Sequence, residues 1–277
     1  MPRLRGAPEV TKRYVRRISL SQFARARHLY IHQGKPDTTG GETVAAVKAR
    51  RNARFPGESA DYRRARNRLL KSEVELRRQI ESVAAQRRKL PLGGEVREDY
   101  VFEALPPGEK KVKKVRLSQL FQPGKDTLFL YNFMFPKSVD SMTPCPSCTS
   151  IIDAVDGAAR HATQRINFVV VAKAPIDKFS RHARKRGWRH AQLLSSANNS
   201  FNADYRAEAP NGQQFPLAHV FVRRGKKIRH FWSSELWFAG PDPGQDMRHV
   251  DFMWPVWSIL DTTPKGRGAT WGPELSY

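Results

Sequence analysis

Cysteine is scarce in this chain, whose 277 residues include only two, Cys145 and Cys148. So small a number excludes a disulfide-stapled scaffold and favours a reducing compartment. A structural zinc site needs four ligands, and the sequence has neither a second C-x-x-C pair nor an H-x3-5-H pair. We therefore expect no metal and no other cofactor. We interpret the later histidines as surface or hydrogen-bonded residues: His161, His182, His190, His219, His230 and His249.

Long apolar runs are missing as well. No apolar stretch reaches the roughly 18 residues that a membrane-spanning helix needs. The N-terminus has no apolar segment followed by a small-residue cleavage site, which argues against a secretory signal. Because 39% of the residues are hydrophobic, the chain can still bury a sizeable core. These features predict a cytoplasmic protein that does not bind membranes.

Acidic residues are the third deficit, with 26 Asp and Glu against 49 Lys and Arg, a formal net charge of +23. Residues 1–55 hold 13 basic and 3 acidic side chains, which gives this segment +10. Such a charge predicts non-specific polyanion binding at low salt. We interpret the segment as a solvated extension, the alternatives being a nucleic-acid-binding arm and an Arg-rich transit peptide. No zinc finger, RNA-binding aromatic motif or Gly-rich phosphate loop accompanies the charge.

What the sequence does have is both cysteines in one C-x-x-C motif, Cys145 to Cys148. The strand-like apolar run 127–135 precedes the motif, and residues 149–164 are typical of a helix. A thiolate at a helix start is stabilised by free N–H groups and by the helix dipole, so its pKa falls. This context favours a redox dithiol over the alternatives, a structural disulfide or half of a zinc site.

The order of the two cysteines predicts their roles. Cys145, at or just before the N-cap, is the expected nucleophile, and Pro146 suits the first helical position because it has no N–H to leave unpaired. Cys148 lies one turn further on the same face and is the expected resolving thiol. Ser147 and Thr143 are expected to support the site. Thr143 also suggests peroxide reduction as a variant, although its spacing to Cys145 differs by one from the Thr-x-x-Cys of peroxiredoxins.

The elements around the motif predict an α/β fold with a thioredoxin-like central mixed sheet flanked by helices. The order is strand, dithiol, helix, strand, helix, hairpin and final helix. Pro216 precedes the hairpin and is the candidate for the proline, cis in thioredoxins, that faces the dithiol. A docking surface for substrate is expected from 133–135 and from the region of Trp188 or Trp237. The expected segments are strands 100–102, 115–117, 127–135, 166–172 and 191–195, helices 149–164, 176–186 and 255–260, and a hairpin over 218–232.

A long amphipathic helix is predicted over 59–90, with an apolar residue every seven positions. This apolar stripe either packs on the globular domain or forms a coiled-coil contact with a second subunit in a homodimer. The helix starts at Ser59 and ends before Pro91. The chain therefore divides into a basic, poorly ordered extension (1–57), a long helix with a linker (58–98) and a thioredoxin-like domain (99–277).

Several motifs in this order resemble those of a bacterial thioredoxin-like family of unknown function, DUF899, whose members are predicted dithiol–disulfide oxidoreductases. The resemblance covers about residues 58–277. It implies a thioredoxin-like fold with Cys145 and Cys148 as the dithiol, and it names no substrate. The motifs are Glu75–Glu81, Leu92–Val96, Asp99–Glu103, Leu128–Phe135, Cys145–Cys148, Arg248–Asp251, Trp254–Pro255 and Leu260–Gly268.

Two functions follow from the sequence. The first is a thiol–disulfide oxidoreductase whose partners are protein or small-molecule thiols and disulfides, with Cys145 as nucleophile and Cys148 as resolving thiol. The second is a non-enzymatic basic protein of thioredoxin fold that binds nucleic acid or an acidic partner. The intact dithiol favours the first, and the charge of +23 favours the second.

Overall fold

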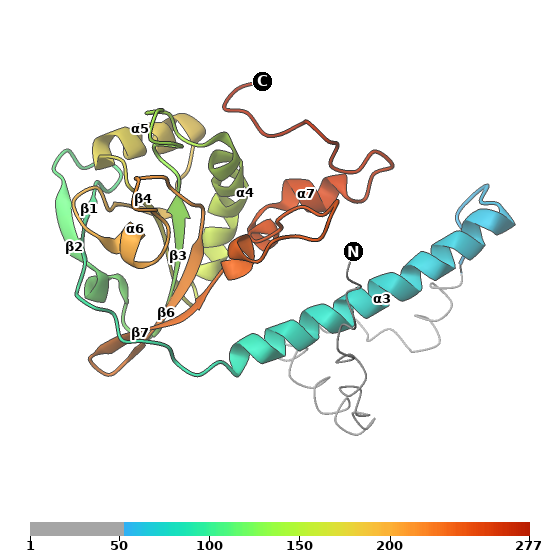
Figure 1. Cartoon of the computed structure of the whole chain (residues 1–277), viewed down its shortest axis with the longest axis horizontal. Coiled ribbons are helices and arrows are strands. Elements are labelled where there is room, and N and C mark those ends of the chain that lie inside the picture. Colours follow the sequence, from blue (N-terminus) through green and yellow to red (C-terminus); the bar gives the residue numbers. More distant parts are fainter. Residues whose placement is uncertain (1–52) are drawn as a thin grey trace, which may run out of the picture. The chain divides into compact units, whose positions relative to one another are not determined.

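The structure is a computed structural model that describes residues 53–277 (Figure 1). Nearly all of the predicted extension 1–57 lies outside these residues. The contacts divide the chain between Leu76 and Arg77, inside the helix α3 (Ala60–Arg88). Each part is therefore described by itself. Within 53–277, no helix has both the length and the apolar character that crossing a bilayer requires.

Helix α3 confirms the long helix predicted from the heptad spacing. The side chain of Ser59 accepts a hydrogen bond from the backbone N–H of Tyr62 at 3.1 Å, as an N-cap residue does. The helix ends at Arg88, shortly before Pro91. No residue of α3 is buried. The partner of its apolar stripe, and with it the homodimer, stays a prediction.

Residues 77–277 contain one seven-stranded mixed sheet in the order β2-β1-β5-β4-β3-β6-β7. Strands β3, β4 and β5 are parallel, whereas β1 pairs antiparallel with β5, and β6 with β3. The strand–helix–strand unit β3–α4–β4, followed by the hairpin β6–β7, is the thioredoxin-like arrangement that the sequence predicts. The strands are β1 (Val101–Ala104), β2 (Lys113–Arg116), β3 (Thr127–Phe133), β4 (Asn167–Ala172), β5 (Gln192–Ser195), β6 (Ala218–Arg224) and β7 (Lys227–Ser233).

Alternation along the central strands creates two separate cores, one on each face of the sheet. In β3, Tyr131 and Phe133 face one core, and Leu128 and Leu130 face the other. Every residue of β4 is buried, because both faces of this strand are covered. An uninterrupted apolar run is the sequence pattern of such a strand.

Helices α4 and α5 cover the first face of the sheet, and the short helix α6 covers the second (Figure 1). Helix α5 ends at Gly187, whose φ of 79° suits glycine at a helix C-terminus. The dithiol lies where β3 leads into α4, so its environment is the first core. The helices are α4 (Pro146–Ala162), α5 (Ile176–Arg186), α6 (Phe201–Asp204) and α7 (Pro255–Leu260), with 3-10 turns at Leu117–Leu120, Glu235–Phe238 and Asp251–Met253.

Candidate active site

The first cysteine of the motif is the N-cap residue of α4. Cys145 has an extended backbone, with φ −67° and ψ 126°, and Pro146 occupies the first turn. The Sγ atom of Cys145 accepts a hydrogen bond from the backbone N–H of Cys148 at 3.5 Å. The backbone N–H of Cys145 donates to the carbonyl of Met134 at 3.0 Å, which ties the helix start to the segment after β3. The sulfur therefore takes the place of an N-cap oxygen.

These contacts make Cys145 acidic. Its pKa falls from 9.0 to about 6, chiefly because the Cys148 thiol donates to its sulfur, with the backbone N–H groups of Cys148 and Ser147 adding to the effect. Partial burial opposes the shift without cancelling it. At pH 7, a pKa of about 6 leaves about 90% of the thiol ionised, against about 1% at a pKa of 9. A sulfur of this kind is the attacking group in thiol–disulfide exchange.

The second cysteine has the opposite environment. Cys148 is buried, with 1% of its surface exposed, and burial raises its pKa well above the ordinary value. The Tyr131 hydroxyl from β3 donates a hydrogen bond to Cys148 Sγ at 3.3 Å. Both thiols are free, so the structure represents the reduced dithiol. The motif therefore pairs a half-buried sulfur of lowered pKa with a buried sulfur of raised pKa.

A hydrogen-bonded bridge connects the dithiol to helix α5. The Thr149 hydroxyl donates to the carbonyl of Cys145 at 2.9 Å and lies 3.1 Å from Nε2 of His182. Burial lowers the pKa of His182 to about 4, so its ring is neutral at pH 7. Because the hydroxyl proton goes to the carbonyl, His182 Nε2 acts as the donor to Thr149. Sequence reasoning missed Tyr131, Thr149 and His182, because nothing in their local sequence marks them.

Of the residues predicted to support the site, Ser147 is the one that acts on the Cys145 sulfur. Ser147 lies in the first turn of α4, and both its backbone and its side chain help to lower the pKa of Cys145. Thr143 is exposed, and its hydroxyl pairs with Ser141 at 2.7 Å in the loop before the motif. Pro216 is half-buried, and its carbonyl lies 3.0 Å from Nε2 of His249.

Pro216 is the candidate for a cis-proline that faces the dithiol, and the sequence left the isomer of its peptide bond open. The peptide bond before Pro216 is not cis; in the described part of the chain, the cis bond joins Phe135 and Pro136. The sequence singled out Pro216 by its position before the hairpin, and position alone does not set the isomer of an X-Pro bond.

The expected apolar docking surface is largely wrong. Phe133, Phe135 and Trp188 are 1%, 5% and 9% exposed, and they pack in the first core. Met134 is half-buried beside them. Trp237 lies away from this cluster, against the ring of His249 at 4.5 Å. Phe133, Phe135 and Trp188 pack between the sheet and its helices and leave little apolar surface for a substrate.

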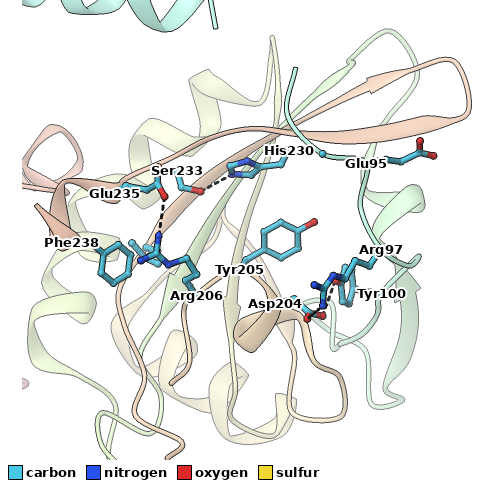
Figure 2. A pocket seen from close by; sticks show the side chains of 12 residues that line it. Glu95, Arg97, Tyr100, Asp204, Tyr205, Arg206, His230, Ser233, Glu235 and Phe238 are labelled. Carbon is cyan, nitrogen blue, oxygen red and sulfur yellow. Dashed lines mark hydrogen bonds and ion pairs between the residues drawn. The ribbon is translucent and has the colours of Figure 1, made fainter. Parts of the chain in front are cut away.

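A second polar region lies on the opposite face of the sheet, around a pocket of about 280 Å³ (Figure 2). Tyr205, which packs against the second core, presents its hydroxyl to this pocket. Arg206 has a positive φ of 61°, which is uncommon for a residue with a side chain. Its guanidinium lies 4.0 Å from the centre of the Phe238 ring and donates to Glu235 at 3.1 Å.

A β-bulge builds a chain of hydrogen bonds beside this pocket. In the pairing of β6 with β7, Val220 is opposite Trp232 and Phe221 is opposite His230, so Phe231 has no partner. Because of this extra residue, His230 and Ser233 face the same side although they are three positions apart. Ser233 Oγ lies 2.7 Å from Nε2 of His230 (Figure 2). The same oxygen lies 2.6 Å from Nδ1 of His219. Burial lowers the pKa of His219 to about 3, so this ring stays neutral. Within residues 53–277, no group of three or more His, Cys, Asp or Glu side chains is placed to hold a metal ion.

The comparison with family models gives one match of high coverage. The model described as a bacterial protein of unknown function, DUF899, matches residues 52–276. No curated protein matches the sequence.

Similar solved structures are distant in sequence. A reduced 2-Cys peroxiredoxin of Plasmodium vivax is 18% identical, with 61% of this chain and 96% of that chain covered and a TM-score of 0.39. An exposed lipoprotein thioredoxin of Streptococcus pneumoniae is 14% identical, with 57% and 99% covered and a TM-score of 0.34. A 1-Cys peroxiredoxin of Plasmodium falciparum is 10% identical, with 61% and 98% covered and a TM-score of 0.40.

Proposed function

The chain belongs to the DUF899 family of bacterial proteins, and we propose that it is a thiol–disulfide oxidoreductase that uses the Cys145–Cys148 dithiol. The observation that carries this proposal is the position of Cys145 at the N-cap of α4, where its sulfur accepts the backbone N–H of the buried Cys148. The pKa of Cys145 is lowered to about 6, whereas that of Cys148 is raised by burial. Perturbed groups of this kind concentrate at functional sites.

The proposed reaction has two exchange steps. The Cys145 thiolate attacks one sulfur of a substrate disulfide, forms a mixed disulfide and releases the other half of the substrate as a thiolate. Cys148 then attacks Cys145 Sγ, which closes the Cys145–Cys148 disulfide and releases the second half, and the proton of the Cys148 thiol ends on one of the two released halves. Two electrons pass from the dithiol to the substrate, and an external dithiol returns the protein to its reduced form.

Tyr131 has a positioning role in the second step. Its hydrogen bond to Cys148 Sγ works against burial and lowers the pKa of that thiol. The same contact stabilises the charge that develops on the sulfur as its proton leaves. Burial raises the pKa of Tyr131 itself well above 10, so the phenol stays protonated and remains a donor.

Peroxide reduction receives less support than disulfide exchange. Peroxidases of this type need an arginine close to the reactive sulfur. In the described residues, the groups whose hydrogen bonds lower the pKa of Cys145 are Cys148 and Ser147, and no arginine is among them. Thr143, the other expected mark of a peroxidase, pairs with Ser141 instead.

A redox titration tests the proposed function. Purified protein equilibrated in buffers of defined potential is expected to show one two-electron couple between about −120 and −270 mV, the span of thioredoxin-like dithiols. Mass spectrometry after thiol alkylation measures the oxidised fraction and assigns it to Cys145 and Cys148. Absence of a couple in this range, together with tight, salt-sensitive DNA binding, would support the non-enzymatic basic protein instead.

A further inference from the structure

Helix α5 presents a row of cations beside the dithiol. Lys178, Arg181 and Lys185 are exposed and spaced three and four positions apart, so they lie along one face of the helix. Within residues 53–277, neither lysine forms an ion pair. Arg181 contacts Asp177 at 3.4 Å, and 72% of the Arg181 side chain remains exposed. Exposed pairs of this kind are weak, so the row keeps its positive potential.

This row forms one wall of a shallow pocket of about 330 Å³. The three cations line it together with His182, Phe135 and Met142, and none of the residues that line it is acidic. Phe135 is buried and gives the pocket a fixed apolar wall, whereas Met142 is 62% exposed at its rim. A concave site with an apolar wall and charge of one sign selects a small anion that also has an apolar part.

The pocket and the dithiol share structural parts. His182 hydrogen-bonds to Thr149, and Thr149 donates to the carbonyl of Cys145. On the other side, Phe135 directly follows Met134, whose carbonyl accepts the N–H of Cys145. His182 is neutral at pH 7 because burial lowers its pKa to about 4, so the positive charge of the pocket comes from Lys178, Arg181 and Lys185.

We propose that this pocket, the α5 cation pocket, binds the carboxylates of a small anionic disulfide while Cys145 attacks its sulfur. The inference rests on the proposed function and adds the substrate class. Lys178, Arg181 and Lys185 hold the carboxylates, and the disulfide reaches the thiolate at the start of α4. Electrons follow the two exchange steps described above, and both halves of the substrate leave as anionic thiols.

The test compares small disulfides of different charge as substrates for the full chain, with an external dithiol as reductant. The probes are oxidised glutathione (anionic), hydroxyethyl disulfide (neutral) and cystamine (cationic). In the triple variant Lys178→Gln, Arg181→Gln, Lys185→Gln, kcat/KM for oxidised glutathione is expected to fall about tenfold, since each exposed charge contact contributes modestly. For hydroxyethyl disulfide, kcat/KM is expected to stay within twofold, and for cystamine it is expected to rise.

A matched control separates the local pocket from the general charge of the protein. The triple variant Lys110→Gln, Lys111→Gln, Lys114→Gln removes the same charge from exposed positions on and before β2, which three other strands separate from β3 in the sheet. It is expected to leave the kcat/KM of all three probes within twofold of wild type. Unchanged kcat/KM for oxidised glutathione in the α5 variant, or an equal fall in the control, overturns the α5 cation pocket. Failure of wild-type protein to reduce hydroxyethyl disulfide overturns the proposed function itself.

Discussion

Replacing Cys145 by serine is expected to remove disulfide reduction almost completely, to below about one thousandth of the wild-type rate. The pKa of the Cys145 thiol, about 6, makes it mostly thiolate at neutral pH, whereas a serine hydroxyl stays protonated and cannot form a disulfide. The measurement is turnover of an insulin-type protein disulfide with an external dithiol as reductant. Loss of this size follows only if Cys145 carries the first step.

The fold is expected to survive this substitution. Cys145 is the N-cap residue of α4, and serine is among the preferred residues at that position. Thermal unfolding of the Cys145→Ser variant should therefore lie close to that of wild type. A variant that folds normally and keeps more than a tenth of wild-type turnover would show that another group performs the attack.

Replacing Cys148 by serine is expected to stop the reaction one step later. Cys145 still attacks, because the backbone N–H groups of the first turn remain and a serine hydroxyl can donate in place of the thiol. Without a resolving sulfur the mixed disulfide persists, so turnover falls at least about a hundredfold. Mass spectrometry of the variant after exposure to substrate is expected to show one substrate half on Cys145 per chain.

The Tyr131→Phe variant is the matched control for the persistent mixed disulfide of the Cys148→Ser variant. It removes the hydrogen bond to Cys148 Sγ and keeps both cysteines, so it is expected to slow the second step without accumulating a stable adduct. A Cys148→Ser variant that turns over at the wild-type rate, or that carries no adduct, would contradict the role of Cys148 as resolving thiol.

Local sequence patterns predicted most of the elements that position the dithiol. Helix α5 has the predicted bounds because Pro175 and Gly187 mark both of its ends. Residues 166–172 are apolar or small except for Asn167. This run correctly predicted β4 as a buried central strand. Helix α4 begins at Pro146 with Cys145 as its N-cap residue, as the interpretation of the C-x-x-C motif predicted, and it ends two residues before the predicted end at 164.

The contacts that tune the dithiol could not be predicted, because they join residues far apart in the chain. Tyr131 and Cys148 meet only because strand alternation turns Tyr131 toward the core beneath α4. Thr149 and His182 are 33 positions apart in the sequence, and their contact depends on how α4 and α5 pack. Phe133 and Phe135 seemed suited to a docking surface because their composition is apolar, yet the same property buries them.

The bulge in β7 is a further feature that the sequence hides. Regular alternation would place His230 and Ser233 on opposite faces, and the skipped position at Phe231 places both on one. The hydrogen bonds from Ser233 to both histidines therefore depend on a local break in the pairing pattern.

The most direct test of the account is the pH dependence of Cys145 alkylation in reduced wild-type protein. Iodoacetamide reacts with the thiolate, so its rate at each cysteine, followed by mass spectrometry, reports the ionised fraction. The account predicts that the rate at Cys145 rises with a midpoint near pH 6 and levels off above pH 7, while Cys148 reacts far more slowly. A midpoint near pH 9 at Cys145, or faster reaction at Cys148, would contradict it.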